Sequence, residues 1–476
     1  MGSSALPGGD DTIVAIATPP GRGAVALLRV SGPAAHDIAG RVIAPWRPVP
    51  RAAFLATLRD PETGDVIDHP LVTAYEGPRS YTGEHLVEIA VHGGSVVPAL
   101  ALAALLAAGA RQALPGEFTR RAVLAGKMDV LQAEAVADLV DATSRAMHRA
   151  AVEHLDGALS RRIAGLRDAL IDLEALLAYD IDFPDEDDGP VPAARVSAAA
   201  EALLAELDAL LATAGAGEVV RHGALVVIAG APNAGKSSLF NALLGRARAI
   251  VTDVPGTTRD AIEGVIDVGR WPVRLVDTAG LRETADVVER LGIEVSERYL
   301  AEADAVLACG EDAPSLACTV TRIRARTSAP VLAVRTKVDM VSVGYETQAG
   351  AARDAGEELF SDCYEVETPA HRAAVSTITG AGLAELAAAL AALLDRMHGG
   401  RAADLPLLTR ERHRLAIQRA RDEVAAFVHA WRGGMLPAPV AATHLRAAEG
   451  ALQELIGVVD VEELLDRVFS AFCVGK

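Results

Sequence analysis

Hydrophobic and polar positions change their spacing along this chain of 476 residues. Residues 11–126 alternate short apolar runs with glycine and proline breakers, whereas residues 130–214 carry apolar positions at helical spacing. From Gly217 strand-like and helix-like segments alternate, which predicts a parallel doubly wound sheet. A last helical part begins at Thr409. The pattern therefore predicts a helical domain interrupted by an inserted α/β domain.

One long segment of the sequence contains no charged residue. Residues 93–110 carry no charge over eighteen positions, the minimum length of a membrane span. Their glycines, Pro98 and many alanines favour a buried helix at 98–108 instead. The first residues lack a basic region followed by an apolar one, so we expect a cytoplasmic protein without a membrane segment. The other predicted elements are strands at 13–17, 24–30, 86–91, 224–229, 271–276, 331–335 and 373–375, and helices from Lys236 and at 383–396.

Composition narrows the class of protein. The length suggests about three domains, and 51% hydrophobic residues are enough to give each a core. A formal net charge of −19 argues against a general nucleic-acid coat, because binding a polyanion over a wide surface requires many basic side chains. The four cysteines show no metal-ligand spacing, so we expect free thiols in a reducing compartment.

A phosphate-binding motif follows the predicted strand at 224–229. Residues 230–237 read GAPNAGKS and fit the pattern GxxxxGK[ST] between a strand and a helix. Backbone N–H groups of such a turn and the following helix N-terminus form an anion site. We expect Lys236 to reach the β- and γ-phosphates and the Ser237 hydroxyl to bind Mg²⁺.

Two further segments stand at the intervals expected downstream of this motif. Asp277 ends a predicted strand and begins the sequence DTAG, whose Gly280 has no side chain to block its N–H from a γ-phosphate. The hydroxyl-rich segment GTTRD at 256–260 supplies a threonine for the metal. We therefore expect Ser237, Thr258 and Asp277 to hold Mg²⁺.

A base-reading element follows the predicted strand at 331–335. Residues 336–339 read TKVD and resemble the NKxD box of the GTPase superfamily, whose aspartate accepts two hydrogen bonds that only guanine offers. Thr336 replaces the usual asparagine, so we expect a weaker affinity for the base. The expected GTP-binding residues are Gly230, Asn233, Ala234, Gly235, Lys236, Ser237, Ser238, Thr252, Gly256, Thr257, Thr258, Asp277, Thr278, Ala279, Gly280, Thr336, Lys337, Asp339, Ser376 and Thr377.

The chain resembles the MnmE (TrmE) family of tRNA modification GTPases over nearly its whole length. Besides the nucleotide motifs, the landmarks that carry the resemblance are DTIVAIATPPGRGAVALLRVSGP at 11–33, SYTGEHLVEIAVHGG at 80–94, PGEFTRRAVLAGKMDVLQAEAVADLVDA at 115–142, IDFPDED at 181–187 and FCVGK at 472–476. The resemblance implies an α+β tetrahydrofolate-binding domain at 1–126, an all-α helical domain at 127–216 and 398–476, and an inserted P-loop GTPase domain at 217–397.

The resemblance also implies a reaction and its partners. It implies a homodimer that joins an FAD-containing MnmG protein in a heterotetramer or larger assembly, with the FAD on that partner. The assembly installs an aminomethyl-type (carboxymethylaminomethyl) group at C5 of the wobble uridine of certain tRNAs. The one-carbon unit comes from a 5-formyl or 5,10-methylene tetrahydrofolate, and GTP hydrolysis is coupled to G-domain dimerisation.

Several residues take roles only through this resemblance. The folate contacts are Arg29, Glu88, Lys127 and Lys476, and Cys473 lies near the one-carbon site. From sequence alone each of the four charges reads more simply as a solvated surface residue. No histidine or cation beside Cys473 indicates a lowered thiol pKa, so a nucleophilic role has little support.

The hydrolytic machinery departs from the Ras type, because the run after DTAG, LRET at 281–284, contains no glutamine. The resemblance implies a K⁺ ion instead of an arginine finger, with Asn233, Lys236 and Glu289 as catalytic residues and Glu289 positioning water indirectly. A monovalent cation at this point would neutralise charge that develops in the transition state. The implied K⁺ ligands are Asn233, Thr252, Val254 and Thr257.

Two other functions stay open at this stage. One is an Era-like GTPase switch in ribosome assembly, which predicts a basic RNA-binding module at the end of the chain, whereas this tail is helical and of mixed charge. The other is a folate-dependent aminomethyltransferase whose G domain is only regulatory. The best basic candidate for contact with tRNA is 409–421, where Arg410, Arg414 and Arg421 fall near one helical face, although an ordinary solvated surface explains them equally well.

Overall fold

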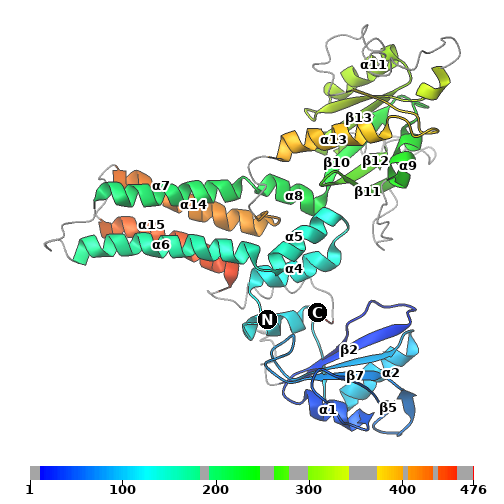
Figure 1. Ribbon diagram of the computed structural model, residues 1–476, viewed down its shortest axis with the longest axis vertical. Coiled ribbons are helices and arrows are strands. Elements are labelled where there is room, and N and C mark those ends of the chain that lie inside the picture. The colour runs from blue at the N-terminus through cyan, green and yellow to red at the C-terminus, as the bar shows by residue number, and fades with distance from the viewer. Residues whose placement is uncertain are drawn as a thin grey trace, which may run out of the picture. The chain divides into compact units, whose positions relative to one another are not determined.

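The structure is a computed structural model of the chain. It describes residues 11–182, 192–246, 262–277, 298–341, 372–399, 406–432, 438–457 and 475. The chain divides into two compact units. Figure 1 colours the chain by residue number, from blue at the N-terminus to red at the C-terminus. The first contains Met1–Ala137, His154–Arg167 and Glu449–Lys476, and the second contains Asp138–Glu153 and Asp168–Ala448.

The first unit is built on a six-stranded sheet in the order β4-β7-β8-β2-β1-β9, with a second sheet in the order β3-β5-β6. Helices α1 (Ala35–Val42) and α2 (Val96–Ala107) contribute to the core that buries Leu28, Val87 and Ile89. The strands are β1 (Ile13–Ile16), β2 (Val25–Ser31), β3 (Ile43–Ala44), β4 (Ala53–Leu55), β5 (Thr57–Arg59), β6 (Val66–Asp68), β7 (Leu71–Tyr75), β8 (Leu86–His92) and β9 (Arg111–Gln112).

Sequence pattern predicted β1, β2 and β8 but not the strands between β2 and β8. Of these, β3, β4, β5 and β6 span two or three residues each, too few for an alternating pattern to stand out. The uncharged run at 93–110 contains α2, a helix of twelve residues that buries Pro98, Ala101, Ala104 and Leu105. Within the described ranges, no helix combines the length and the apolar character that a membrane crossing requires.

A buried ionic cluster fixes helix α3 (Glu117–Leu124) against the start of β1. The Arg121 side chain is 7% exposed and pairs with the carboxylates of Asp11, Glu84 and Glu117. Arg111 adds a second cation, with its Nη2 2.6 Å from Glu117 Oε1. Burial alone would raise the pKa of Glu117, but Arg111, the Leu114 N–H and Arg121 outweigh it and lower that pKa.

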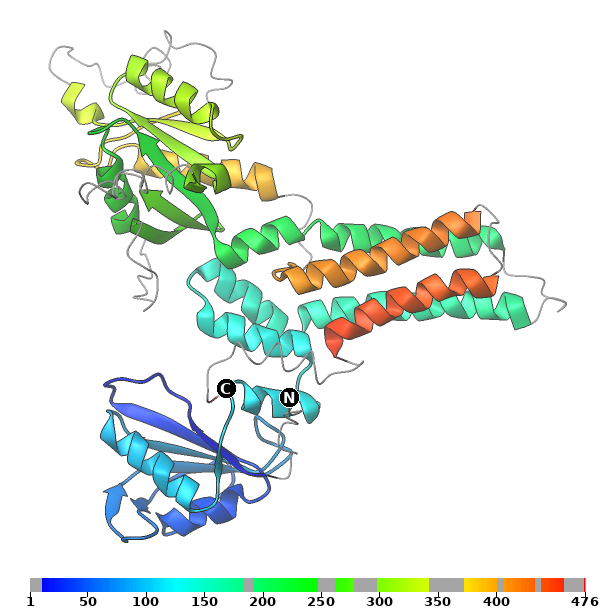
Figure 2. The same cartoon turned by 180° about the vertical axis from the view of Figure 1, so that it is seen from behind.

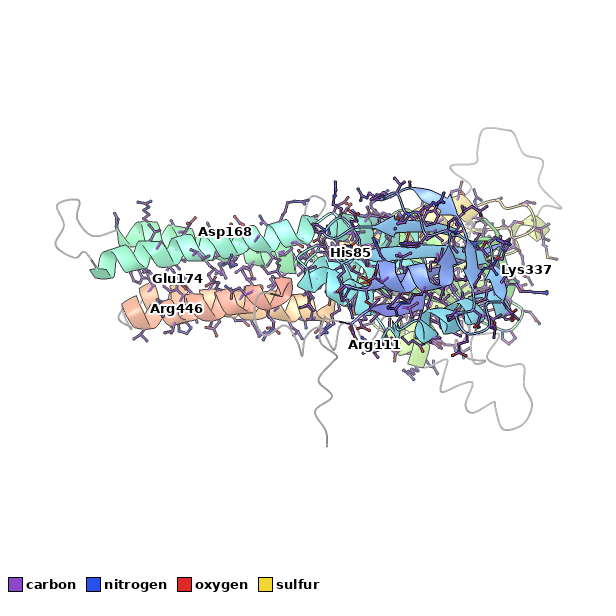
Figure 3. All side chains as sticks on the ribbon, turned by 90° about the horizontal axis from the view of Figure 1, so that it is seen from below. His85, Arg111, Asp168, Glu174, Lys337 and Arg446 are labelled. Atoms are coloured by element: carbon purple, nitrogen blue, oxygen red, sulfur yellow. The ribbon has the colours of Figure 1, made fainter. Side chains whose placement is uncertain are left out.

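Long helices make up much of the described chain outside the two six-stranded sheets. Figures 1 and 2 show α7 beside α14 and α6 beside α15. The buried positions of α7 recur every three or four residues, as an amphipathic helix requires. Figure 3 labels Glu174 of α6 and Arg446 of α15, which form an ion pair of 3.9 Å. These helices are α4 (Val130–Asp141), α5 (Arg145–Leu155), α6 (Ala158–Asp182), α7 (Ala193–Leu211), α8 (Ala214–His222), α14 (Glu411–Arg432) and α15 (Ala438–Ile456).

The second unit contains a six-stranded sheet in the order β11-β12-β10-β13-β14-β15. Alternate residues of β10 face opposite cores, because Val226 and Ile228 pack in the cluster with α9 and α13 while Leu225 and Val227 pack in the one with α11. Burial on both faces explains why β10 reads as an unbroken apolar run. The elements are β10 (Ala224–Gly230), α9 (Lys236–Arg246), β11 (Ile262–Val268), β12 (Trp271–Asp277), β13 (Ala305–Gly310), α11 (Ala313–Arg324), β14 (Val331–Arg335), the 3₁₀ turn η2 (Val338–Val341), β15 (Arg372–Ala374) and α13 (Leu383–His398).

The predicted fold class is confirmed, with one refinement of the sheet. Strands β12, β10, β13, β14 and β15 are parallel, but the edge strand β11 runs antiparallel to β12. A two-residue turn joins Val268 to Trp271, and a connection this short can join only antiparallel strands. The predicted boundary between 216 and 217 falls inside α8, and the four-part division of the chain stays a prediction.

Candidate functional site

The predicted phosphate loop connects β10 to α9 at the carboxyl edge of the six-stranded sheet of the second unit. A methyl group at Gly230 would lie 2.6 Å from the Cys309 carbonyl oxygen, so only glycine lets these strands end side by side. Asn233 and Gly235 both have positive φ, of 64° and 78°. The loop therefore turns sharply before the N-terminus of α9, as a cradle for an anion requires.

Lys236 lies at the first position of α9 and is 7% exposed. Its Nζ donates a hydrogen bond of 2.9 Å to the Ala231 carbonyl oxygen, so the ammonium is directed into the loop. The buried Cys309 thiol lies close enough to interact with this charge, but burial raises its pKa to about 12. The thiol therefore stays protonated and does not compete with a phosphate for Lys236.

Asp277 ends β12 and is 1% exposed. Strand register pairs it with Ile228, two residues before the loop begins. Ser237 is exposed in the first turn of α9. A hydroxyl and a carboxylate are oxygen donors of the kind that Mg²⁺ prefers, so these two residues fit the predicted metal site. Among the described residues, no group of three or more His, Cys, Asp or Glu side chains is placed to hold a metal alone.

The predicted base-reading turn lies where β14 ends. Thr336 is 2% exposed, and its hydroxyl donates to the Ala234 carbonyl oxygen of the phosphate loop at 2.9 Å. The Gly310 carbonyl lies within 3.3 Å of the same hydroxyl. Thr336, which departs from the NKxD box, thus links the predicted base-reading turn to the predicted phosphate loop. Whether it weakens base affinity stays a prediction.

The turn 336–339 also contacts the second predicted base loop. The Val338 N–H donates to the Val375 carbonyl oxygen at 3.4 Å, next to Ser376. Ser376 is 1% exposed, and its hydroxyl accepts a hydrogen bond of 3.1 Å from the Thr379 N–H. The structure therefore brings Ala234, Thr336 and Ser376 to one edge of one sheet.

Other predicted site residues lie outside the described residues, so their arrangement stays a prediction. They comprise the predicted K⁺-binding loop and switch positions, the last three residues of DTAG, the glutamate expected to position water, and the C-terminal residues. They are Thr252, Val254, Gly256, Thr257, Thr258, Thr278, Ala279, Gly280, Glu289, Cys473 and Lys476.

Two of the predicted folate contacts pair with each other on neighbouring strands of the first sheet. Arg29 of β2 lies opposite Glu88 of β8, and its Nε donates to Glu88 Oε1 at 2.9 Å. The Tyr75 hydroxyl donates to Glu88 Oε2 at 3.3 Å, and the Arg29 guanidinium lies 5.4 Å from the centre of the Tyr81 ring. Sequence reasoning did not select either tyrosine, although Tyr81 stands within the quoted segment 80–94.

Lys127 and Gly475 border the same region. Lys127 Nζ donates to the Pro78 carbonyl oxygen at 3.0 Å, in the connection between β7 and β8 that also carries Tyr81. Gly475 is buried with φ of 100°, and a methyl group there would lie 2.5 Å from the Ile16 carbonyl oxygen. The residue before Lys476 thus packs against β1, the neighbour of the strand that carries Arg29.

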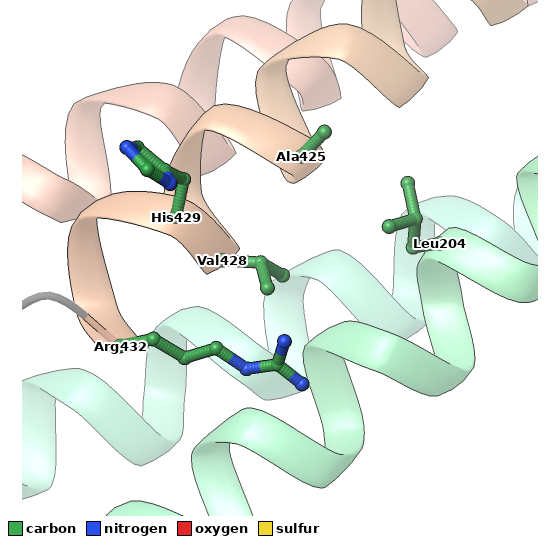
Figure 4. A pocket seen from close by; sticks show the side chains of 5 residues that line it. All are labelled: Leu204, Ala425, Val428, His429 and Arg432. Atoms are coloured by element: carbon green, nitrogen blue, oxygen red, sulfur yellow. The ribbon is translucent and has the colours of Figure 1, made fainter.

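The arginines considered for tRNA contact all pair with acids. Arg410 Nη2 lies 2.6 Å from Asp138, Arg421 Nε lies 2.9 Å from Asp208, and Arg414 pairs with Glu411. These pairs offset the positive charge of the helix face, which makes that face less suited to bind a polyanion such as tRNA. A separate groove of about 450 Å³ lies on α7 and α14 (Figure 4), and it contains no predicted site residue. It is lined by Leu204, Ala425, Val428, His429 and Arg432.

The predicted phosphate loop, the buried carboxylate at the end of the neighbouring strand and the predicted base-side turn lie at the ends of parallel strands in one sheet. This arrangement is that of a P-loop nucleotide-binding protein of the GTPase type. Comparison with known proteins is consistent with this class. Sequence profiles described as "GTP-binding protein TrmE N-terminus" and "MnmE helical domain" match residues 12–127 and 130–473.

Several known proteins are similar to this chain over nearly its full length. A Methylorubrum populi protein named tRNA modification GTPase MnmE is 44% identical over 486 residues, covering 100% of each chain. A Moorella thermoacetica protein of the same name is 41% identical over 98% of this chain and 100% of its own. The chain belongs to the MnmE family. The G domain of the T. maritima FeoB iron transporter matches 36% of this chain and 97% of its own at 23% identity, with a TM-score of 0.24, too low to support an argument.

Proposed function

We propose that this protein hydrolyses GTP and couples hydrolysis to modification of the wobble uridine of certain tRNAs. The observation that carries the proposal is the assembly of the phosphate loop, Asp277 and the turn 336–339 at one sheet edge, in a chain whose full-length relatives are named tRNA modification GTPases. The family name of those relatives supports tRNA as the substrate of the modification.

The nucleotide has a defined set of partners in this proposal. Backbone N–H groups of the phosphate loop and Lys236 bind the β- and γ-phosphates, and Asp339 accepts hydrogen bonds from guanine. Ser237, Thr258 and Asp277 hold Mg²⁺. When bound, that ion neutralises charge that develops on the phosphates. The buried carboxylate of Asp277 and the exposed hydroxyl of Ser237 support this role.

We also propose K⁺ activation, with Asn233, Thr252, Val254 and Thr257 as ligands and Glu289 positioning water. Support comes from Asn233, an exposed residue with left-handed backbone at the tip of the phosphate loop. Residues in this conformation persist where their surroundings or a function require it. GTP turnover should fall strongly when NaCl replaces KCl at equal ionic strength, and equal rates in both salts would refute K⁺ activation.

Residues 1–126 form the folate-binding domain in this proposal. Arg29, Glu88, Lys127 and Lys476 bind a 5-formyl or 5,10-methylene tetrahydrofolate, which supplies the one-carbon unit, and Cys473 lies near that unit. The Arg29–Glu88 pair between Tyr75 and Tyr81 supports the assignment, because cations suit the folate glutamate tail and a carboxylate suits the pterin amino groups. The proposed partners are a second copy of the chain and an FAD-containing MnmG protein.

Mass spectrometry of tRNA nucleosides tests the coupled function. A strain without the gene would be complemented with wild type, Lys236→Ala or Arg29→Gln. As a matched control we choose Arg22→Gln, because Arg22 is an exposed arginine of the same unit. Loss of the modified wobble uridine in both site variants supports the proposal. Loss only with Arg29→Gln favours the aminomethyltransferase with a regulatory G domain, and loss in neither favours the ribosome-assembly switch.

A further inference from the structure

Lys337 adopts an unusual backbone conformation beside the phosphate loop. Its φ is 57°, in the left-handed region that non-glycine residues rarely occupy. Such a conformation persists only where neighbouring contacts determine it, and it is common at binding sites. Lys337 is labelled in Figure 3.

Backbone contacts on both sides hold this conformation. The Thr336 N–H donates to the Gly310 carbonyl oxygen at 2.9 Å, and the Met340 N–H donates to the Lys337 carbonyl oxygen at 3.1 Å. Together with the Thr336 hydroxyl bond to Ala234, these contacts fix the direction in which the Lys337 side chain leaves the turn. They do not fix the four-carbon side chain itself, which retains several rotatable bonds.

The Lys337 side chain has its own anchor in Glu311. Lys337 Nζ pairs with Glu311 Oε1, and the two side chains are 37% and 48% exposed. Glu311 lies between Gly310, which ends β13, and Asp312, which caps α11 through the Ser315 N–H at 2.8 Å.

This connection from strand to helix is tight. A methyl group at Gly310 would lie 2.8 Å from the backbone of Leu316, so the turn has little freedom to shift. The Arg335 Nε donates to the Glu311 carbonyl oxygen at 3.3 Å and links the turn to β14. The carboxylate that receives Lys337 is therefore carried by a backbone of fixed position.

We propose that Glu311 is a positioning residue for guanine nucleotide binding, which orders the Lys337 side chain before the nucleotide arrives. An exposed ion pair of this kind contributes little to folding stability, so its removal should affect binding without unfolding the protein. Ordering a long side chain in advance removes part of the entropic cost of binding. The inference rests on the proposed GTP-binding function, because it assigns Lys337 to the base-side turn.

Fluorescent GDP titration of the full-length protein tests this role. Variants Glu311→Gln and Glu311→Asp are compared with wild type and with Glu302→Gln. The matched control Glu302 belongs to another exposed ion pair of the same unit, 3.0 Å from Arg298. We expect Glu311→Gln to raise the Kd for GDP about 3- to 10-fold, the range expected when one flexible side chain must be ordered on binding. Glu311→Asp should recover part of the loss, and Glu302→Gln should bind as wild type does.

A double-mutant cycle separates positioning from general damage. In a Lys337→Gln background, Glu311→Gln should cause no further loss, because the side chain that it orders is gone. An equal loss in that background, an unchanged Kd, or tighter binding by Glu311→Gln overturns the proposal. Failure of the wild-type protein to bind guanine nucleotides would instead overturn the proposed function itself. Thermal unfolding of the nucleotide-free variants should show the same midpoint for Glu311→Gln and Glu302→Gln.

Discussion

Replacing Thr336 by valine removes the hydroxyl that joins the base-side turn to the phosphate loop, while nearly preserving side-chain volume. The hydroxyl lies 2.9 Å from the Ala234 carbonyl oxygen and 3.3 Å from that of Gly310. Gly310 keeps a donor after the substitution, because its carbonyl also accepts from the Thr336 N–H. Ala234 is 3% exposed, so water cannot easily replace the hydrogen bond that its carbonyl loses.

The expected cost is that of one buried hydrogen bond whose acceptor loses its donor. Such losses amount to about 1–3 kcal/mol. Thr336→Ser is the matched variant, because it keeps the hydroxyl and removes a methyl group, at a cost of about 1 kcal/mol. Both variants therefore lower the free energy of unfolding, but only valine releases the phosphate loop. Affinity for GDP should fall with Thr336→Val by up to about tenfold, a change of 1.4 kcal/mol, and should stay near wild type with Thr336→Ser.

Urea unfolding and GDP titration together measure these effects. The transition of the nucleotide-binding unit is identified by its upward shift when GDP is added, since a ligand stabilises the folded state that binds it. At a typical slope of about 1–3 kcal/mol per molar urea, the expected cost moves the midpoint by roughly 1 M. Unchanged stability and unchanged GDP affinity of Thr336→Val would falsify the assigned role of the hydroxyl. Equal loss of affinity in the valine and serine variants would also contradict it.

Three further predictions concern single positions. Gly230→Ala should reduce GDP affinity more than about tenfold in titrations, because its methyl group would meet the Cys309 carbonyl at 2.6 Å; near-normal binding would contradict the close strand packing. The lowered pKa of Glu117 means that its contribution to stability is present above its usual 4.5 and is lost as pH falls through the folded-state value. The thermal midpoint should therefore drop in acid less for Glu117→Gln than for wild type, and parallel pH profiles would argue against this. Gly475→Ala should weaken binding of 5-formyltetrahydrofolate in calorimetry. The φ of 100° and the 2.5 Å between a Cβ at this position and the Ile16 carbonyl oxygen exclude a side chain. If the variant binds the folate as tightly as wild type does, the C-terminal residues are not part of the folate site.

Local signals in the sequence predicted strands β10, β12, β14 and β15 of the nucleotide-binding sheet. They missed β13 (Ala305–Gly310), although all six of its residues are buried. Strand β14 lies at the predicted 331–335, and α9 begins at Lys236 as predicted. Strand β11 escaped prediction because its identity depends on pairing with β12 through a two-residue turn. For β10 and β14, by contrast, an apolar run between breakers was sufficient.

Side-chain partners distant in sequence could not be predicted. The Thr336 hydroxyl meets a carbonyl 102 positions away, and Arg421 pairs with Asp208 at a separation of 213. Sequence reasoning selected Arg421 for charge and spacing alone, and nothing local indicated the acid that offsets it. In the same way, Tyr75 meets Glu88 only through the pairing of β7 with β8.

The chain leaves the helices for the nucleotide-binding sheet and returns to them at nearly the same point. The Leu408 N–H donates to the Thr213 hydroxyl at 3.0 Å across a separation of 195 residues, and a methyl group at Gly217 would lie 2.2 Å from the Leu408 carbonyl oxygen. An inserted segment whose ends lie close together destabilises the surrounding helical domain little. The entropic cost of closing a loop rises by only about 0.6 kcal/mol for each doubling of its length. A domain could therefore enter an ancestral helical protein at this junction without stretching it, and the same junction offers a place to exchange one inserted domain for another.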